Sequence, residues 1–277
     1  MEFFIDIMQY QYLMNAFLAA ILSGIMCGIV GTYIVSRRMV FLCGGITHSS
    51  FGGLGIAVYY GANPLFGALI FAIASALGIE WASRNRVIRE DSAIGIIWSV
   101  GMAVGALFLN LTPGYTSGDL TSYMFGSIIT VTNQEVVVLA IFTFVCVIGF
   151  ATWWRPIIFL AFDHDYAASQ GVSTRYILYF LSAIVAIAIV LAIRIMGIVL
   201  LLSLFTIPCV AANYLTKSYR NITLTASLMA TIGTVTGLVI SYNLEVPPGT
   251  CIIFTLLIML FVAKILSLRN IKNAIKE

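Results

Sequence analysis

The sequence predicts an all-α membrane protein, a polytopic bundle of about nine transmembrane helices with its N-terminus outside and its C-terminus in the cytoplasm. Of the 277 residues, 61% are hydrophobic and only 9% are charged, whereas a soluble domain usually carries about 25% charged residues. The apolar runs are long enough for helices, which need roughly 20 residues to cross the hydrocarbon. The sequence lacks the short alternating segments that are typical of membrane β-strands.

Nine apolar segments follow one another along the chain. They cover roughly residues 13–35, 41–60, 64–83, 93–110, 135–152, 176–193, 195–215, 221–241 and 249–267. The sixth and seventh segments adjoin at Arg194. If they were a single span, the later connections would fall on the wrong sides of the membrane, so the sequence favours nine spans over eight or ten.

The placement of the basic residues sets the orientation. With the N-terminus outside, 13 of the 14 lysines and arginines fall on the cytoplasmic side and only Arg194 falls outside. Cytoplasmic connections of membrane proteins carry an excess of basic residues, so this split supports the orientation. The outside connections are short and hold Asp119, Glu135 and Glu245.

We expect one transmembrane domain over residues 1–277, because the connections are short on both sides. The five cysteines lie in apolar segments without a C-x-x-C pair, which favours small buried hydrophobes. No Walker A motif occurs, so the chain does not hydrolyse ATP by itself. No catalytic constellation is visible, and the basic residues follow one membrane face, which argues against an enzyme and against nucleic-acid binding.

Glycines recur at the four-residue spacing that allows close helix packing. The three pairs are Gly24-x-x-x-Gly28, Gly101-x-x-x-Gly105 and Gly233-x-x-x-Gly237. A polytopic bundle needs such contacts internally, so we interpret them as packing within one chain rather than as dimerisation motifs.

His48 is one of two histidines and lies within the second apolar segment. An ionisable side chain in a membrane span is costly, so it is a functional candidate by default. Imidazole is a good ligand for zinc and other borderline transition metals, although a histidine hydrogen-bonded to a neighbouring helix is the structural alternative. Gly45, Gly52 and Gly55 share its side of the helix and leave room for a partner helix or a narrow path.

The longest cytoplasmic connection, roughly 153–175, contains a short predicted helix at about 160–172. Asp163 suits its N-cap and Gly171 its C-terminal end. The helix is either a solvated loop helix or a docking element for a cytoplasmic partner. His164 is expected to be a surface residue rather than a metal ligand.

Several short motifs occur in a fixed order along the chain. They are Arg37-Arg38-Met39, Gly44-Gly-Ile-Thr-His48-Ser, Asp119-Leu-Thr-Ser-Tyr-Met-Phe-Gly126, Asp163 with Ala167 and Gly171, Gly197-Ile-Val-Leu, Pro208 to Ala212, and Val246-Pro-Pro-Gly249. Each is loose alone. Together with the topology, they resemble the permease subunits of bacterial ABC importers for zinc, manganese or iron, over about residues 20 to 262.

The resemblance implies a multi-pass protein of the bacterial cytoplasmic membrane that does no bond chemistry. A second permease copy would form the path with it, and the transported metal ion would be its substrate, without a permanently bound cofactor. A separate cytoplasmic ATP-binding subunit would dock on Asp163, Ala167 and Gly171. An extracytoplasmic metal-binding protein would deliver the ion, with Glu245 and Arg194 as candidate contacts.

One position departs from the family. There an aspartate commonly precedes the histidine by four residues, so that both project from one helix face and share a cation, but here that position is Gly44. Either another carboxylate completes the site, or the ligands are softer, or the substrate is a metal chelate such as haem or a siderophore. Asp119 is a further candidate for guiding a cation, although capping a helix explains it as well.

An ion-coupled secondary transporter is the alternative from another class. Such a transporter is expected to carry buried relays of Asp, Glu and His, of which this chain has few. It would also leave the docking-helix pattern unexplained.

Overall fold

The computed structural model describes residues 2–85, 87–114, 127–162, 166, 169–170 and 174–274. These residues are helical almost throughout, and the described part of the chain contains no strand. The prediction of an all-α bundle is therefore confirmed.

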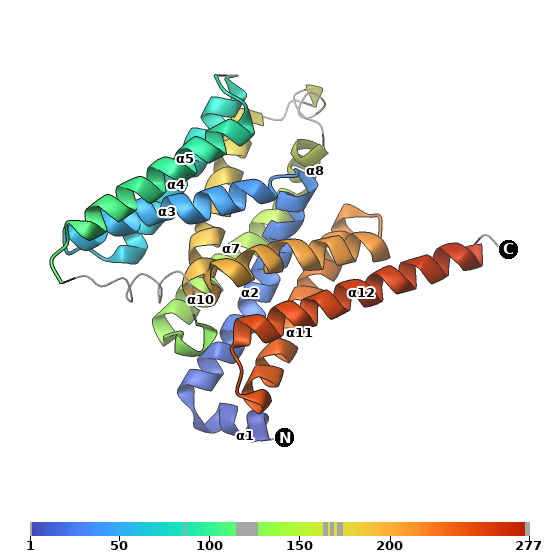
Figure 1. Cartoon of the computed structure of the whole chain (residues 1–277). Coiled ribbons are helices and arrows are strands. Elements are labelled where there is room, and N and C mark those ends of the chain that lie inside the picture. The colour runs from blue at the N-terminus through green and yellow to red at the C-terminus, as the bar shows by residue number, and fades with distance from the viewer. Residues whose placement is uncertain are drawn as a thin grey trace. The chain divides into compact units, whose positions relative to one another are not determined.

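Figure 1 shows the described helices. They are α1 (Glu2–Gln9), α2 (Gln11–Ser36), α3 (Val40–Tyr59), α4 (Pro64–Arg84), α5 (Glu90–Asn110), the 3-10 turn η1 (Ile128–Thr130), α7 (Asn133–Thr152), α8 (Trp154–Phe162), α10 (Thr174–Leu215), α11 (Tyr219–Leu244) and α12 (Pro248–Ala274). Eight described helices, namely α2 to α5, α7 and α10 to α12, are long and apolar enough to cross a membrane. The prediction of a multi-pass membrane protein is thus confirmed.

Helix α10 accounts for the difference between eight helices and nine predicted segments. It has 42 residues, which at 1.5 Å per residue is about twice the thickness of the ~30 Å hydrocarbon layer. Gly197 interrupts it with φ 77° and ψ 170°, a conformation outside the helical region that joins two helices across a kink. Only glycine adopts these angles without strain. The two halves of α10 correspond to the sixth and seventh predicted segments.

The sequence did not predict the two short helices α1 and α8. Helix α1 is held against α11, which carries Tyr242. The hydroxyl of Tyr242 donates a hydrogen bond to the carboxylate of Asp6 on α1, and the Phe3 and Tyr242 rings lie 5.2 Å apart. Helix α8 lies within the predicted cytoplasmic connection. Its Ile157 and Leu160 are each only 1% exposed, whereas Arg155 and Phe162 are exposed, so α8 has one buried face.

The chain forms two compact units. The first contains residues 1–37, 127–158 and 195–277. Its central helix is α2, which packs against α11 at glycines. A Cβ added to Gly28 would lie 2.2 Å from the Cα of Ser227, and one added to Gly24 would lie 2.6 Å from the Cα of Thr231. The two backbones are therefore in direct contact, and the helices run in opposite directions.

Polar contacts and further glycines join the other helices of this unit. Asn15 donates to the carbonyl of Val131 at 3.0 Å, and Gln11 donates to the side-chain oxygen of Asn133 at 3.1 Å. These contacts bring the starts of α2 and α7 together, so the two helices run in the same direction. On α11, a Cβ at Gly237 would lie 2.5 Å from the Cα of Ile252 on α12.

The second unit contains residues 38–126 and 159–194. Its helices α3, α4 and α5 lie side by side (Figure 1). A Cβ at Gly53 of α3 would lie 2.0 Å from the carbonyl oxygen of Gly67 on α4, and one at Gly101 of α5 would lie 2.5 Å from the Cα of Ser49 on α3. Each of the three glycine pairs from the sequence packs against a helix of the same chain, which confirms the intrachain interpretation.

These helix directions bring basic residues together within each unit. In the first unit, the end of α2 at Arg37 lies alongside the start of α11 at Arg220, because Gly24 contacts Thr231 and Gly28 contacts Ser227. In the second, α3 and α4 run in opposite directions, so the start of α3 after Arg38 lies at the same end as Arg84. The alternation of the chain therefore agrees with the basic side inferred from the sequence.

Candidate functional site

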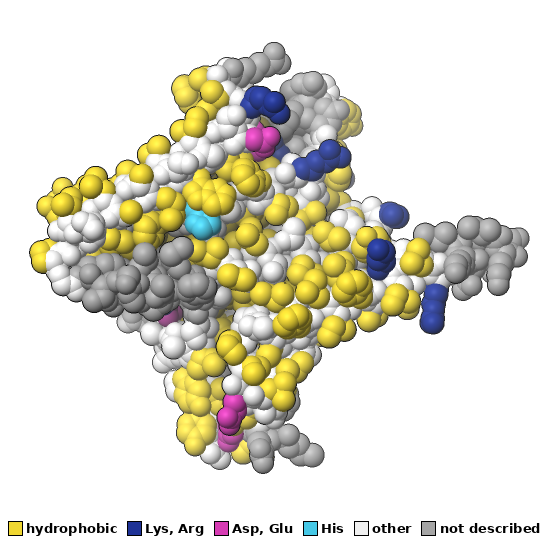
Figure 2. All heavy atoms as spheres, viewed as in Figure 1, with side chains coloured by type: hydrophobic (Ala, Val, Ile, Leu, Met, Phe, Trp, Pro, Cys, Tyr) yellow, Lys and Arg dark blue, Asp and Glu magenta, His cyan; other side chains and the backbone are white. Residues whose placement is uncertain are grey.

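His48 lies on α3 and stacks against Trp98 of α5. The two ring centroids are 4.4 Å apart and the planes differ by only 4°. His48 is half-buried. As the one histidine among the described residues, it is the cyan side chain in Figure 2, where it lies at the surface among apolar side chains. An imidazole is thus presented on an otherwise apolar face of a membrane helix.

The indole of Trp98 also lies beside Gly44, one helical turn before His48. A Cβ added to Gly44 would lie 3.8 Å from Cζ3 of Trp98, an ordinary van der Waals distance. The position that would carry a carboxylate in the family therefore faces the same aromatic ring as His48. An aromatic side chain lies beside this turn of α3, and glycine provides no anionic oxygen there.

The polar atoms around His48 do not form a complete metal site. The Nδ1 of His48 and the Oγ1 of Thr47 are buried and have no hydrogen-bond partner among the described residues. A metal-binding histidine almost always donates its second ring nitrogen to a carboxylate, a carbonyl or a water. Within the described part of the chain, no three His, Cys, Asp or Glu residues come close enough to hold an ion. His48 is therefore a single candidate ligand.

The glycines around His48 are filled by α5 and do not line a path. A Cβ at Gly45 would lie 2.5 Å from Cγ2 of Ile94, and one at Gly55 would lie 2.6 Å from the carbonyl oxygen of Gly105. Gly52 similarly lies against Gly101. Of the two possibilities that the sequence left open, the structure shows the partner helix. This close packing fixes the register in which Trp98 meets His48.

The cysteines behave as expected from the sequence. All five are buried. Cys43 lies near His48 in sequence, but its thiol is directed at the carbonyl of Met39, 3.9 Å away. It therefore supplies no ligand next to the imidazole.

Sequence reasoning missed a carboxylate inside a span. Glu80 lies on α4, is half-buried, and accepts a hydrogen bond from the Ser182 hydroxyl of α10 at 3.3 Å. An acid within an apolar segment is itself a signal of function, and this signal applies to Glu80 as it does to His48. Ser182 satisfies one of its oxygens, and the contact joins α4 to the first half of α10 within the second unit.

The other predicted site residues have different outcomes. Asp119 lies outside the described residues, and so do the docking-helix positions Asp163, Ala167 and Gly171. Glu245 is exposed, and it ends α11 in the left-handed conformation with φ 54°. Arg194 is half-buried near the end of the first half of α10.

The fold and the site together define a membrane helical bundle of the transport class, with an apolar face, a half-buried imidazole and an interrupted long helix. The model of the ABC 3 transport family matches residues 9–267. The chain therefore belongs to the ABC 3 transport family, which confirms the resemblance drawn from the motifs. It is a membrane component of a transport system and not an enzyme.

Two curated relatives extend along most of the chain. An uncharacterized membrane protein of Synechocystis sp. is 32% identical over 252 residues, which are 91% of this chain and 89% of that protein. The manganese transport system membrane protein MntC of Halalkalibacterium halodurans is 32% identical over 252 residues, 91% of this chain and 86% of the relative.

The fold also matches a solved structure. PsaBC from Streptococcus pneumoniae in complex with Fab contains a chain that superposes with a TM-score of 0.83 at 24% identity. The match covers 95% of this chain and 94% of the other. At this identity the likeness concerns the fold, and it supports the helical arrangement described above.

Proposed function

We propose that this chain is the permease subunit of an ABC importer that moves a divalent transition-metal ion into the cytoplasm, with His48 on the pathway. The observation that carries the proposal is the half-buried imidazole on the apolar face of α3. Membership of the ABC 3 transport family supports a role in transport. The name of the Halalkalibacterium relative makes manganese one of the candidate ions. Zinc and iron remain candidates because imidazole suits these ions well, whereas manganese prefers carboxylate oxygens.

In this proposal one copy of the chain does not supply all the ligands of the ion, and a second copy supplies the others. Two copies of the chain form the path between them, so that two His48 side chains serve one pathway. Softer nitrogen ligands then replace the carboxylate that Gly44 lacks. The unpartnered Nδ1 of His48 supports this assignment, because a ligand that no hydrogen bond orients suits transient passage better than tight storage.

Transport itself is a switch between two states. A separate ATPase docks on the segment that contains Asp163, Ala167 and Gly171, and a binding protein meets the opposite side near Glu245 and Arg194. ATP and the binding protein shift the permease between outward and inward access only if they bind the two states with different affinity. The permease contributes the path and the two packed states.

The pathway is tested by metal content in cells whose growth depends on this chain. We expect His48→Ala to lower uptake of one of zinc, manganese or iron at least tenfold. Tyr59→Ala, at an exposed aromatic position of the same helix α3, is the matched control and retains uptake. If all three metals stay at wild-type levels with His48→Ala, then His48 is structural and the pathway assignment is wrong.

The ATPase partner is tested separately by co-purification. Asp163→Ala and Gly171→Leu are expected to release a co-purifying ATPase while the permease itself stays folded in the membrane. Active transport by the purified chain in liposomes without any ATPase would show an ion-coupled transporter instead.

A metal chelate is the second candidate substrate. Gly44 leaves the turn before His48 without a carboxylate, and the flat indole of Trp98 lies beside it. Competition decides between the two: an excess of haem or siderophore, but not of free ion, reduces uptake if the chelate is the substrate. The opposite pattern supports the bare ion.

A further inference from the structure

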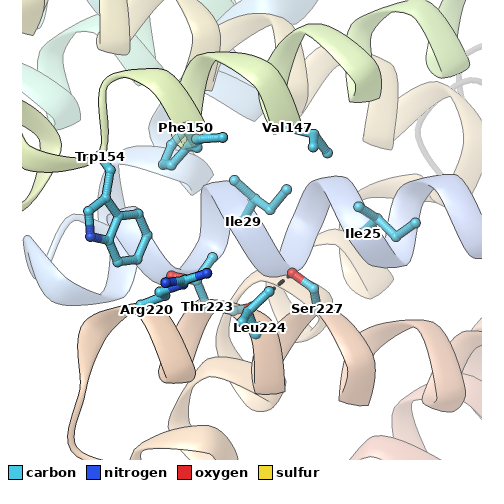
Figure 3. Close-up of a pocket in the computed structure, with 10 residues that line it drawn as sticks. Ile25, Ile29, Val147, Phe150, Trp154, Arg220, Thr223, Leu224 and Ser227 are labelled. Carbon is cyan, nitrogen blue, oxygen red and sulfur yellow. Dashed lines mark hydrogen bonds between the residues drawn. The ribbon is translucent and has the colours of Figure 1, made fainter.

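A pocket of about 570 Å³ opens between α2, α7 and α11 of the first unit (Figure 3). Its lining is apolar over most of its length, with Ile25 and Ile29 from α2 and Val147 and Phe150 from α7. This volume falls within the usual range of small-molecule sites, about 300–1,000 Å³. The proposed metal pathway does not use it, because His48 belongs to the other unit.

The pocket has one charged end. Arg220 and Trp154 lie together there, at the start of α11 and just past the end of α7, as Figure 3 shows. Arg220 is exposed, and no acidic side chain is among the described residues that line the pocket. The end with the positive charge is also the end that the distribution of basic residues assigns to the cytoplasmic side.

The pocket extends inward from that end along the helices. On α11 it reaches from Arg220 to Ser227, which is about 10 Å for seven residues of helix. On the other side it extends from Trp154, the first residue of α8, back along α7 to Val147. Ser227 donates its hydroxyl to the carbonyl of Thr223 at 2.9 Å, so this hydroxyl is already bonded within α11. The inner part of the pocket thus offers mainly apolar surface, while its mouth offers a cation and an indole.

We propose that this pocket binds an anionic phospholipid of the cytoplasmic leaflet. The lipid phosphate lies at Arg220, and an acyl chain lies along Ile29 and Ile25. Basic pockets between transmembrane helices on the cytoplasmic side recognise anionic headgroups, and tryptophan prefers the membrane interface. A cation with no acidic side chain among the described lining residues, at the mouth of an apolar pocket, favours an amphiphile with a negative head over a purely apolar occupant.

The test measures how much lipid the full chain retains and how its stability depends on the lipid. Nanodiscs of phosphatidylglycerol are compared with nanodiscs of phosphatidylcholine. Phosphatidylglycerol is expected to raise the unfolding temperature of the wild type more than phosphatidylcholine does. Arg220→Gln should lose this difference and bind phosphatidylglycerol about fivefold more weakly, the factor that corresponds to about 1 kcal/mol per basic residue near anionic lipid. Lys217→Gln is the matched control, because Lys217 is exposed on the same side and does not line the pocket.

A second variant tests the apolar part. Ala151 is exposed and lines the pocket, so Ala151→Trp should fill it and abolish retention of bound lipid seen by mass spectrometry. Leu224→Phe, from the facing helix, serves if the first variant does not fold. The proposal is overturned if Arg220→Gln and Lys217→Gln behave alike, if the filled variants keep their lipid, or if Ala151→Cys cross-links to a second copy, which would make the pocket an interface between chains.

Discussion

The imidazole of His48 stacks on the indole of Trp98, with the ring centroids 4.4 Å apart and the planes almost parallel. The stack joins α3 to α5 at the one imidazole that the described apolar face carries. It also explains how a half-buried histidine is held without a hydrogen bond to Nδ1, since an aromatic pair contributes about 0.5–1.5 kcal/mol beyond burial. The orientation of the proposed ligand therefore depends on a tryptophan and not on a polar partner.

Restoring the family's carboxylate should be tolerated and should change metal preference. A side chain at Gly44 meets only Trp98, at 3.8 Å, so Gly44→Asp is expected to fold. The added oxygen would share a cation with His48 one turn away and favour manganese. We expect manganese uptake relative to zinc to rise several-fold, as measured by cellular metal content. Gly44→Asn, of nearly the same shape but uncharged, should leave the ratio unchanged.

An equal change in the manganese-to-zinc uptake ratio with Gly44→Asp and Gly44→Asn would mean that the shape of the added side chain, rather than its charge, alters metal preference. No shift with Gly44→Asp, in a protein that still transports, would place the metal pathway away from this turn of α3.

Close helix contact predicts which glycines cannot be enlarged. A Cβ at Gly53 would lie 2.0 Å from the carbonyl oxygen of Gly67, so Gly53→Ala must push α3 from α4. Overpacking of this kind costs about 1–3 kcal/mol, and the unfolding temperature in detergent should fall clearly. Gly95→Ala is the control on α5, because nothing lies within 4 Å of its added Cβ. Equal melting of the two variants would contradict the packing between α3 and α4.

The interruption of α10 predicts two spans in one long helix. A reporter enzyme that is active only outside the cytoplasm, fused after Met196, should be active, whereas the same reporter fused after Lys217 should be inactive. Activity of the fusion after Lys217 would indicate a single span, because Lys217 would then lie outside. Gly197→Ala forces φ 77° on a residue with a Cβ, a strain of about 1–3 kcal/mol, and should lower the yield of folded protein. Gly149→Ala, at an open position in α7, should not.

Charge and backbone strain can be separated at Glu245. Its left-handed conformation, φ 54°, costs a residue with a Cβ about 1–2 kcal/mol. Glu245→Gly should therefore raise the unfolding temperature, and Glu245→Gln should leave it unchanged. If the carboxylate contacts the binding protein, both variants weaken that complex to the same degree in a pull-down. Unchanged binding by both would limit Glu245 to a role at the end of α11.

The sequence anticipated most of the fold because a bilayer restricts a chain to a few solutions. The lengths of the apolar segments predicted the membrane spans, and the positions of the basic residues predicted which connections face the cytoplasm. The sequence divided α10 at Arg194, three residues before the interruption that the structure shows at Gly197. Helix α8 is apolar but too short to span the membrane, so hydropathy assigned it to a connection.

The candidate site was less predictable. Isolated polarity in an apolar segment was enough to identify His48, and the same reasoning applied to span three would have found Glu80. Nothing in the sequence indicated that Trp98 would stack on His48, or that Gly44 would face the same indole. That meeting depends on the register between α3 and α5, which contacts such as Gly55 against Gly105 set.

The amino-acid sequence by itself determined the class of the protein, its topology and the imidazole to test. The physical reason is that a membrane span must be apolar along its whole length, so spans and isolated polar residues are visible in the sequence. Only the tertiary structure decided which helices touch, since glycine spacing permits a close approach without naming the partner. It filled the space beside His48 with α5, and it opened a pocket between α2, α7 and α11. Side chains distant in sequence meet in both places, and packing alone brings them together.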